Sequence, residues 1–328
     1  MTKKINAGIS AFGSYAPEKL LTNFDLEKMM DTNDEWIRSR TGIETRHMAA
    51  EGEFASNIAI GSVADLVKRF GKKSLEGVEL VIVATSSPDA LFPATASMVQ
   101  SHFDLDAGAF DLLIACPGWI YGLSVAQAYV EAGLMKKVLV IGTEALTKIM
   151  DYSDRNISIL FGDGAGAAVV EAVDSDYGFQ SFLLGSDGNG AKHLGIRAAA
   201  NKLPDGTPMP DGPFMNGREV FKFAVRIMPN ATLEVLEKAN MSLDDVDLFV
   251  PHQANSRIVT AAADKLGLDY DKMVLVVNEY GNTSTASIPL ALADAYDAGR
   301  IKKGDNLVFV SFGAGLSWAA MTLKWSID

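Results

Sequence analysis

The only cysteine of the chain, Cys116, lies between an apolar segment and the expected start of a helix. Residues 110–115 predict a buried strand, Pro117 suits the first turn of a helix, and Gly133 suits its end. A thiol at this junction faces the positive end of the helix dipole, which favours the thiolate. The position therefore suits a nucleophile, although a lone cysteine without context is more often a small core residue.

Three segments of the C-terminal half give this cysteine a chemical context. His252 follows the apolar residues 248–250, where it can donate or accept a proton. Asn282 follows residues 273–277 and opens the next expected helix, so its amide N–H₂ group can donate to a carbonyl oxygen. Segment 311–315 follows the last expected strand, and its small residues let backbone N–H groups approach an oxyanion. Taken singly, the three also fit a core histidine, a helix N-cap and a tight turn.

Cysteine, histidine and asparagine together suit carbon–carbon bond formation on a thioester. The thiolate takes up an acyl group, and a second thioester then loses CO₂ or a proton to give an enolate. Histidine and asparagine can hydrogen-bond the enolate oxygen, while backbone N–H groups hold the tetrahedral oxyanion. Loss of one oxyanion donor costs roughly 3 kcal/mol in other enzymes, so such donors are energetically significant.

The elements that must position these residues alternate between apolar strands and helices, which implies sheets covered on both faces. Strands are expected at residues 80–84, 138–141, 248–250, 273–277 and 307–310. A glycine lies 17 residues after both Cys116 and Asn282, and a lysine pair begins 20 residues after both. This agreement indicates two copies of one β/α unit, joined near residues 172–180. Packing about a pseudo-two-fold axis would bring Cys116, Asn282 and His252 to one cleft at the carboxyl ends of the strands.

Composition indicates a globular protein. The 328 residues are 48% hydrophobic and 21% charged, and the net charge of −12 argues against a nucleic-acid partner. No segment reaches the ~18 apolar residues of a membrane span. Residues 1–7 lack the apolar core of a signal peptide. One cysteine excludes an internal disulfide, and four histidines show no metal-binding spacing. We therefore expect a cytoplasmic protein with no membrane partner and no metal.

Two further segments are interpreted through their glycines. Residues 185–215 contain ten glycines and prolines, which predict a long loop or hairpin that either covers a site or is a simple insertion. Residues 162–167 have a superficial likeness to a dinucleotide-binding loop. They lack the full glycine spacing of that motif and the acidic residue about 20 positions on. We interpret them as tight backbone packing near the site.

Taken in order, these motifs resemble the β-ketoacyl-[acyl-carrier-protein] synthase III family of the thiolase-like superfamily along nearly the whole chain. The segments that carry the resemblance are 31–37, 40–43, 115–118, 161–167, 215–222, 251–255 and 281–284. The resemblance implies an α/β thiolase-like fold with two duplicated β/α halves, 1–174 and 175–328, in a five-layered αβαβα arrangement. The first half would carry the nucleophile, and the second the histidine and asparagine.

The resemblance also implies roles for individual residues. Cys116 would be acylated, and His252 and Asn282 would assist malonyl decarboxylation. The amides of Cys116 and Ala314 would form the oxyanion hole. Coenzyme A would be bound by Trp36, Arg40 and Arg155, with its adenine between Trp36 and Arg155. Phe312 would line the acyl pocket, and Phe92 would reach it across a dimer interface. The expected carrier-protein contacts are Gln253, Ala254, Asn255, Ser256, Arg257, Lys222 and Lys265. The three basic residues of this set would form a local positive patch that steers an acidic carrier protein.

Two positions depart from the family pattern. Pro117 stands where the family more often has Ala or Ser, which removes one donor from the helix end and leaves the Cys116 amide intact. Ala314 replaces a common glycine, and its methyl group is tolerable where φ is negative. We expect the chemistry to survive both changes.

The implied reaction is a decarboxylative condensation that begins type II fatty-acid synthesis. A short acyl-CoA and malonyl-carrier protein would give 3-oxoacyl-carrier protein, CO₂ and CoA through an acyl-cysteine. Coenzyme A is then a substrate thioester, no prosthetic group is expected, and a second copy of the chain completes a homodimer. Two alternatives stay open. One is a related condensing enzyme that makes a secondary-metabolite or polyketide starter, and the other is a non-catalytic acyl-CoA-binding protein on the same scaffold. The retained signatures favour the first reading.

Overall fold

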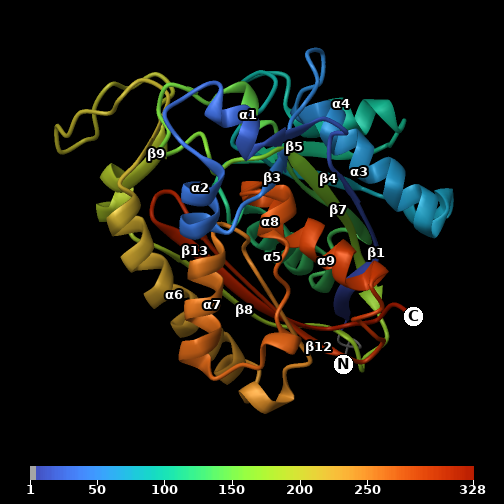
Figure 1. Cartoon of the computed structure of the whole chain (residues 1–328). Helices are drawn as coiled ribbons and strands as arrows, with labels where there is room; N and C mark the ends of the chain where they lie inside the picture. Colours follow the sequence, from blue (N-terminus) through green and yellow to red (C-terminus); the bar gives the residue numbers. More distant parts are fainter. Residues whose placement is uncertain (1–4) are drawn as a thin grey trace.

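The computed structural model describes residues 5–328 and contains two main sheets (Figure 1). The first sheet has, in spatial order, β1 (Asn6–Tyr15), β7 (Gly164–Val173), β6 (Lys137–Glu144), β4 (Leu80–Ala84) and β5 (Gly108–Leu112). The second has β11 (Leu248–Pro251), β12 (Asn306–Gly313), β13 (Ser317–Lys324) and β8 (Gly178–Ser186). Each sheet takes its strands from one side of the turn at residues 174–177. The expected boundary between 174 and 175 lies in this turn; the two-half division stays a prediction, and residues 1–4 lie outside the described chain.

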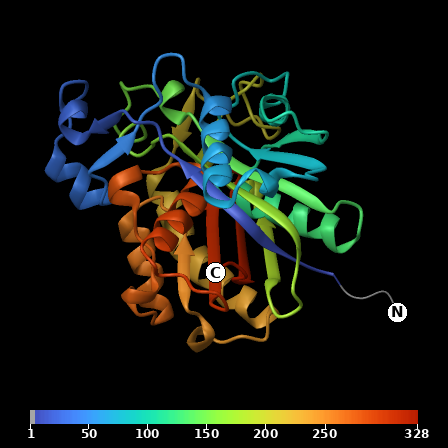
Figure 2. The same cartoon turned by 90° about the vertical axis from the view of Figure 1, so that its right-hand side faces the viewer.

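Helices form three layers around the two sheets, which gives the predicted five-layered αβαβα arrangement. α3 (Ala55–Phe70) and α4 (Thr95–His102) pack on the outer face of the first sheet. Figure 2 views the molecule from this side, with α3 in front of the sheet. α5 (Gly118–Glu131) and α9 (Ser287–Asp297) lie between the sheets, and α6 (Gly217–Lys238) and α7 (Ser256–Leu266) cover the second sheet. Trp119 of α5 packs against Phe309 of β12 with ring centroids 5.8 Å apart, so one core joins both halves.

Shorter elements complete the chain around the strand ends. They are β2 (Leu20–Thr22), α1 (Asn23–Glu27), α2 (Asp34–Thr41), β3 (Thr45–His47), β9 (Leu194–Ile196), β10 (Pro213–Met215) and α8 (Val277–Tyr280). β2 pairs with β3, and β9 pairs with β10, both antiparallel. In the described part of the chain, no helix is long and apolar enough to cross a membrane.

Four of the five apolar runs predicted as strands are confirmed as β4, β6, β11 and β12, but the prediction for residues 273–277 is wrong. This run makes one parallel bridge, from Met273 to β11, and then turns into α8. The side chain of Gln253 forms hydrogen bonds with backbone groups of this run that would otherwise pair with a neighbouring strand. It donates to the carbonyl oxygen of Val274 at 3.0 Å and accepts from the backbone N–H of Val276 at 2.9 Å. The second sheet therefore has no full counterpart of β5.

Two further sequence expectations need correction. The strand predicted at residues 110–115 ends at Leu112, and its side chains are only partly buried. Leu113 is 76% exposed, because β5 lies at the edge of its sheet and has one neighbour. The strand at 307–310 is also not the last one, since β13 follows it. Segment 311–315 therefore ends β12 and connects it to β13.

The helices after Cys116 and Asn282 support the internal duplication. α5 begins at Gly118 with Pro117 as its N-cap residue. Gly133 and Gly299, which follow α5 and α9, both have φ of +69°, the left-handed conformation common just after a helix. The sequence spacing that first indicated a repeat thus corresponds to two helices that lie between the sheets and end in the same way.

Candidate active site

A cavity of about 490 Å³ opens at the carboxyl ends of the strands and is lined by both halves of the chain. Cys116 lines it from the first half, and His252 and Asn282 line it from the second. This is the edge at which open α/β sheets bind ligands. The structure thus brings together the three residues that the sequence singles out. Among residues 5–328, no three His, Cys, Asp or Glu side chains gather as metal ligands.

The residues that precede Cys116 and Asn282 both have a positive φ angle. Ala115, which precedes Cys116, has φ of +55°, a left-handed conformation that costs a non-glycine residue about 1–2 kcal/mol. Gly281, which precedes Asn282, has φ of +63°. Cys116 and Asn282 each follow such a residue, and both line the one cavity.

Segment 311–315 approaches Cys116 closely at the expected oxyanion hole. A Cβ atom on Gly313 would lie 2.9 Å from the backbone nitrogen of Cys116, so this position requires glycine. Ala314 lines the same cavity, and its φ lies outside the left-handed region. The methyl group that replaces the expected glycine hydrogen is therefore tolerated.

Burial disfavours the Cys116 thiolate, whereas the helix dipole alone predicts that the thiolate is favoured. The residue keeps partial contact with the cavity. Burial nevertheless raises the pKa of its thiol to about 12, and a hydrogen bond with Ser284 offsets only part of the rise. The helix end offers little compensation, because Pro117 has no N–H group and the N–H of Gly118 donates to the carbonyl of Ala115 at 2.8 Å. Desolvation therefore outweighs the dipole.

His252 is a neutral hydrogen-bonding group. Its side chain is 1% exposed, and burial lowers its pKa to about 3. Nδ1 lies 2.6 Å from the hydroxyl oxygen of Ser287, and the ring of Phe312 packs edge-on with centroids 5.4 Å apart. Because Ser287 holds Nδ1, Nε2 is the ring nitrogen left for a ligand in the cavity.

Asn282 offers its amide nitrogen as the free donor. Its Oδ1 accepts a hydrogen bond from the backbone N–H of Ser284 at 2.9 Å. Because Oδ1 is used in this contact, Nδ2 is the side-chain atom that can donate to a ligand. Its backbone N–H donates to Leu160 at 2.8 Å, and its carbonyl accepts from Gly162 at 3.1 Å. These bonds tie the asparagine of the second half to the first half and fix it in the cavity wall.

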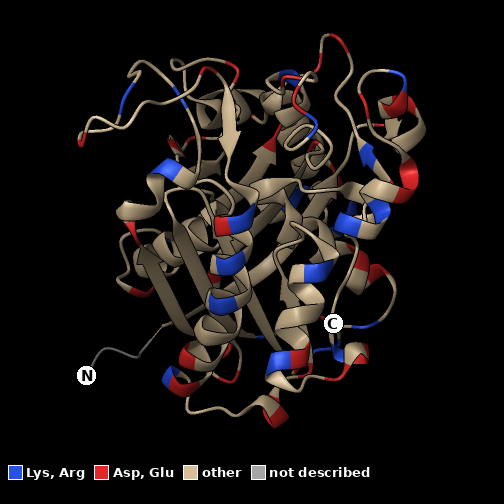
Figure 3. Ribbon diagram, turned by 60° about the vertical axis from the view of Figure 1, so that its left-hand side comes forward, with Lys and Arg blue, Asp and Glu red and all other residues tan. Residues whose placement is uncertain are grey.

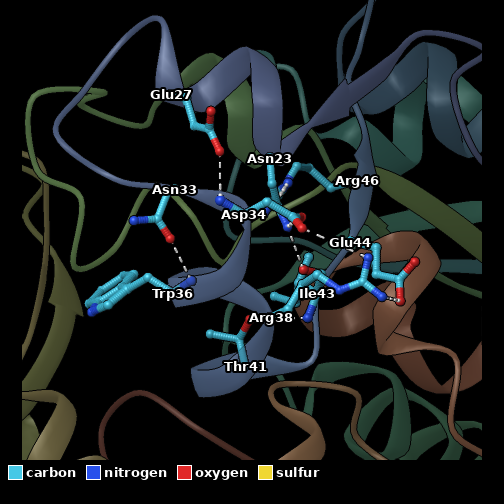
Figure 4. A network of polar contacts seen from close by, with 10 residues as sticks. All are labelled: Asn23, Glu27, Asn33, Asp34, Trp36, Arg38, Thr41, Ile43, Glu44 and Arg46. Carbon is cyan, nitrogen blue, oxygen red and sulfur yellow. Dashed lines mark hydrogen bonds and ion pairs between the residues drawn. The ribbon is translucent and has the colours of Figure 1, made fainter.

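Trp36 lines the cavity from α2, and a chain of polar contacts fixes this helix (Figure 4). Asn33 caps α2 by accepting from the backbone N–H of Trp36 at 2.7 Å. Asn23 donates to Asp34 at 2.9 Å, and the fully buried Arg46 donates to Asn23 at 2.8 Å. The aromatic ring is therefore presented by a helix that is anchored to the protein interior.

Both arginines expected to bind coenzyme A lie against the Trp36 ring. The Cζ atoms of Arg40 and Arg155 are each 5.3 Å from the ring centroid. Arg155 also pairs with the carboxylate of Asp31 at 3.2 Å. An adenine between Trp36 and Arg155 would need about 7 Å, two contacts of ~3.5 Å. Arg155 must therefore move aside before the predicted stacking can form.

Two of the expected carrier-protein contacts are buried, and their part in carrier binding stays a prediction. Gln253 is 1% exposed, and its side chain forms hydrogen bonds with backbone groups of residues 251, 274 and 276. Ala254 is buried and lines the cavity. Asn255 and Ser256 are half-buried at the start of α7, where Asn255 caps the helix and donates to the carbonyl of Arg40 at 3.0 Å.

The three basic residues of the expected patch are exposed on α6 and α7, where Figure 3 shows basic bands on neighbouring helices. Arg257 lines the cavity mouth and packs 5.6 Å from the Phe221 ring centroid. Lys222 pairs with Glu219 at 2.7 Å. Lys265 lies eight residues after Arg257, about 12 Å further along α7. Arg257 is thus the basic residue of the patch at the opening itself.

The two residues expected in the acyl pocket lie in different places. Phe312 is buried and lines the cavity. Phe92 is 89% exposed and does not line the cavity of its own chain. Leu91 and Leu113 are also largely exposed. These three side chains follow the neighbouring strands β4 and β5, so apolar surface is present at that edge of the first sheet.

Of the segment 185–215, residues 194–196 and 213–215 line the cavity, so this part of the segment is more than a simple insertion. β9 and β10 form a short hairpin whose Leu194, Ile196, Phe214 and Met215 line the cavity. Lys202 and Pro208 form a further bridge in the excursion between the two strands. The hairpin therefore supplies apolar surface to the side of the cavity away from the sheets.

Sequence reasoning missed two residues that contact the central groups. Glu144 is fully buried at the end of β6 and acts on the Cys116 thiol. Its place directly after the apolar run 138–141 is a signal that could have found it, because polar residues after strands gather at this edge. Ser287 carries no such signal, since its contact with His252 depends on how α9 packs.

Comparison with known proteins gives one consistent result. The family described as "3-Oxoacyl-[acyl-carrier-protein (ACP)] synthase III" matches residues 110–188, and its C-terminal counterpart matches residues 236–325. A beta-ketoacyl-[acyl-carrier-protein] synthase III from Deinococcus deserti is 49% identical over 98% of this chain and 92% of its own length. One from Caldanaerobacter subterraneus is 49% identical over 99% of this chain and 100% of its own length. A Thermus thermophilus crystal structure of a protein of this name is 58% identical, covers 97% of this chain and 99% of its own, and has a TM-score of 0.96.

The buried His252 makes the folded protein less stable in acid. Its pKa of about 3 in the folded chain lies below the ordinary value of about 6.5, so between these values the unfolded chain binds a proton that the folded chain does not. We expect this residue to lower the free energy of unfolding by about 2 kcal/mol between pH 7 and pH 5. Urea unfolding of the wild type and His252→Gln at both pH values measures the difference.

The control is His102→Gln, which removes an exposed histidine from the end of α4 and should keep the acid dependence of the wild type. An equally steep loss of stability in His252→Gln and the wild type would contradict the account of His252.

Proposed function

The chain belongs to the β-ketoacyl-[acyl-carrier-protein] synthase III family, and from this premise we infer that its cavity carries out a decarboxylative condensation. An acyl-CoA and malonyl-[acyl-carrier protein] give 3-oxoacyl-[acyl-carrier protein], CO₂ and CoA, the first condensation of type II fatty-acid synthesis. The assignment of roles depends on one observation. The shared cavity holds one thiol from the first half and two neutral donors from the second half.

In the first half-reaction, Cys116 takes the acyl group. The Cys116 thiol loses its proton to solvent as its sulfur attacks the thioester carbonyl, the C–S bond to CoA breaks, and the CoA thiolate leaves and takes a proton from solvent. The oxyanion of the tetrahedral intermediate lies between the backbone N–H groups of Cys116 and Ala314, which the contact at Gly313 holds in place. The product of this stage is an acyl-cysteine.

In the second half-reaction, His252 and Asn282 bind the thioester carbonyl of the malonyl group. In this proposal the Ser287 hydroxyl, 2.6 Å from Nδ1 of His252, is the donor of that hydrogen bond, so that Nε2 carries the proton and faces the substrate beside Nδ2–H of Asn282. As CO₂ leaves, negative charge develops on that oxygen, and fixed neutral donors in a buried site stabilise it strongly. The enolate carbon then attacks the acyl-cysteine, and the Cys116 thiolate leaves. The chemistry needs a thiol and hydrogen-bond donors, so no prosthetic group is part of the proposal.

The entrance suits the two carriers of the acyl groups. Trp36, Arg40 and Arg155 form a π-face and two guanidinium planes for the adenine of CoA, once Arg155 moves aside. Arg257 stands at the mouth, where a cation favours the phosphate and acidic surface of the carrier protein. A cytoplasmic location belongs to the same proposal and rests on the single cysteine, which needs no oxidising compartment.

A second copy of the chain is the partner that the exposed apolar edge suits. Phe92, Leu91 and Leu113 are 89%, 81% and 76% exposed, and Leu113 directly follows the edge strand β5. Contact between two such edges would bury these side chains and bring Phe92 toward the acyl pocket of the other copy. We therefore include a homodimer in the proposal.

Acylation and decarboxylation should separate in variants of the three central residues. Radiolabelled acetyl-CoA should label the wild type and leave Cys116→Ala unlabelled. His252→Ala and Asn282→Ala should take the label but release CO₂ from malonyl-carrier protein about 10²–10³-fold more slowly, the loss typical of one oxyanion donor. Label on Cys116→Ala, or wild-type CO₂ release in both donor variants, would refute the assigned roles.

Reversal of the charge at the mouth should weaken carrier binding. Arg257→Glu should raise the KM for malonyl-carrier protein about tenfold at low salt, with kcat nearly unchanged and a smaller effect at high salt. Lys238→Glu, at the far end of α6, is the matched control and should leave this KM unchanged. An unchanged KM in Arg257→Glu would remove this residue from the carrier surface.

The dimer rests on exposed apolar surface and should dissociate when that surface becomes charged. Sedimentation equilibrium at micromolar concentration should give twice the chain mass for the wild type and a lower mass for Phe92→Asp. Phe24→Asp, which changes a 61% exposed phenylalanine on α1, should keep the wild-type mass. A wild type of single-chain mass would contradict the homodimer.

A further inference from the structure

The place of α2 determines where the Trp36 ring stands, and few apolar contacts fix this helix. Of its eight residues, only Ile37 and Thr41 are buried. Apolar contact is non-directional, so one buried isoleucine holds a helix against the core without setting its rotation or tilt. Hydrogen bonds have preferred distances and angles and supply that restraint. The polar contacts of α2 with the interior therefore decide how firmly the aromatic face is placed.

Asn23 makes such contacts at both ends of the helix (Figure 4). This residue is fully buried in α1, and its Nδ2 donates at 2.9 Å to the carboxylate of Asp34, in the first turn of α2. The same nitrogen donates at 2.8 Å to the carbonyl oxygen of Ile43, two residues after the helix ends. Both hydrogens of one amide group are therefore used to hold α2.

Arg46 orients this amide and connects it to the cavity wall. Its Nη1 donates to Oδ1 of Asn23 at 2.8 Å, and its Nη2 donates to the carbonyl oxygen of Ile159, a residue that lines the cavity. A guanidinium group has no acceptor, so the Asn23 atom that it meets is the oxygen, and Nδ2 faces α2. Arg46 is fully buried, which fixes its own position. A continuous chain of hydrogen bonds thus runs from the cavity wall to the Trp36 helix.

We propose that Asn23, oriented by Arg46, is a positioning residue for the acyl-CoA substrate and keeps the adenine face of Trp36 at a fixed distance from Cys116. The inference rests on the proposed function, in which Trp36 meets the adenine and Cys116 attacks the thioester. Both ends of CoA must be bound at once, so a displaced α2 would lose the adenine contact or draw the thioester away from the sulfur. Asn23 does not line the cavity and acts only through α2.

An acyl thioester without a nucleotide should be indifferent to the place of α2. Acetyl-pantetheine has the same reacting carbonyl as acetyl-CoA and lacks the adenine that Trp36 would meet. A displaced α2 should therefore raise the KM for acetyl-CoA alone, whereas general damage to the fold would impair the use of both thioesters. The ratio of the two KM values separates a positioning role from a merely structural one.

Asn23→Asp breaks the tie to α2 and keeps the partner of Arg46. The aspartate still accepts from the guanidinium, but it places an oxygen where Nδ2 donated to Asp34 and Ile43. We expect the KM for acetyl-CoA to rise about tenfold, below the ~100-fold that a misplacement of 1 Å can cost in rate. The kcat and the KM for acetyl-pantetheine should stay nearly unchanged. Steady-state condensation kinetics with both thioesters measure these values.

Exchange of the two side-chain groups provides the matched controls. Asp34→Asn alone keeps an oxygen that can accept from Asn23, so it should retain wild-type kinetics. The double variant of Asn23→Asp and Asp34→Asn restores a donor and an acceptor in reversed order, and it should recover most of the lost acetyl-CoA affinity. If Asn23→Asp does not fold, Asp34→Ala removes the bond to the start of α2 at a half-buried position and should show the same selective rise.

The outcomes separate this inference from the function on which it rests. Equal rises in both KM values for Asn23→Asp, or no recovery in the double variant, would overturn the positioning role. A wild type that prefers acetyl-CoA, together with an unchanged KM in Asn23→Asp, would refute the positioning role alone. Equal KM values for the two thioesters in the wild type would refute the adenine site of the proposed function and this inference with it.

Discussion

The site depends on backbone contacts between the two halves that leave no room for a side chain. A Cβ atom on Gly313 would lie 2.9 Å from the nitrogen of Cys116, and one on Gly142 of β6 would lie 2.6 Å from the carbonyl oxygen of Thr285. These contacts press the end of β12 and the segment after Asn282 onto the strand ends of the first half. The reacting groups share one cavity because the chain backbones that carry them touch.

The same close packing excludes water and thereby decides the charge of each group. Burial keeps His252 neutral and Cys116 protonated, and it brings Glu144 to a pKa of about 7. Neutral donors whose partners are already fixed do not need to reorganise when negative charge develops on a substrate oxygen. Ser287 behind His252 and the backbone of Ser284 behind Asn282 supply that fixation. A site built in this way stabilises an anion that exists only during the reaction.

The entrance of the cavity differs from the interior in its charge. The chain has a net charge of −12, but Arg257 and Arg40 line the cavity, and Arg155 lies against the Trp36 ring. Local cations thus offset the overall charge where anionic carriers would arrive. The hairpin of β9 and β10 adds apolar surface opposite the sheets. The entrance therefore combines an aromatic face and exposed charged groups, whereas the interior is closely packed.

The sequence by itself determined those features that depend on near neighbours along the chain. Apolar runs predicted β4, β6, β11 and β12, and matching glycine and lysine spacings predicted two repeats with Cys116 and Asn282 at equivalent places. Only the tertiary structure decided which groups are buried and what they bond. Residues 273–277 form a connection that hydrogen-bonds with the Gln253 side chain instead of the expected strand, and burial raises the pKa of the Cys116 thiol. Periodicity and helix caps are set within a few residues, whereas desolvation and hydrogen-bond partners come from segments that meet only after folding.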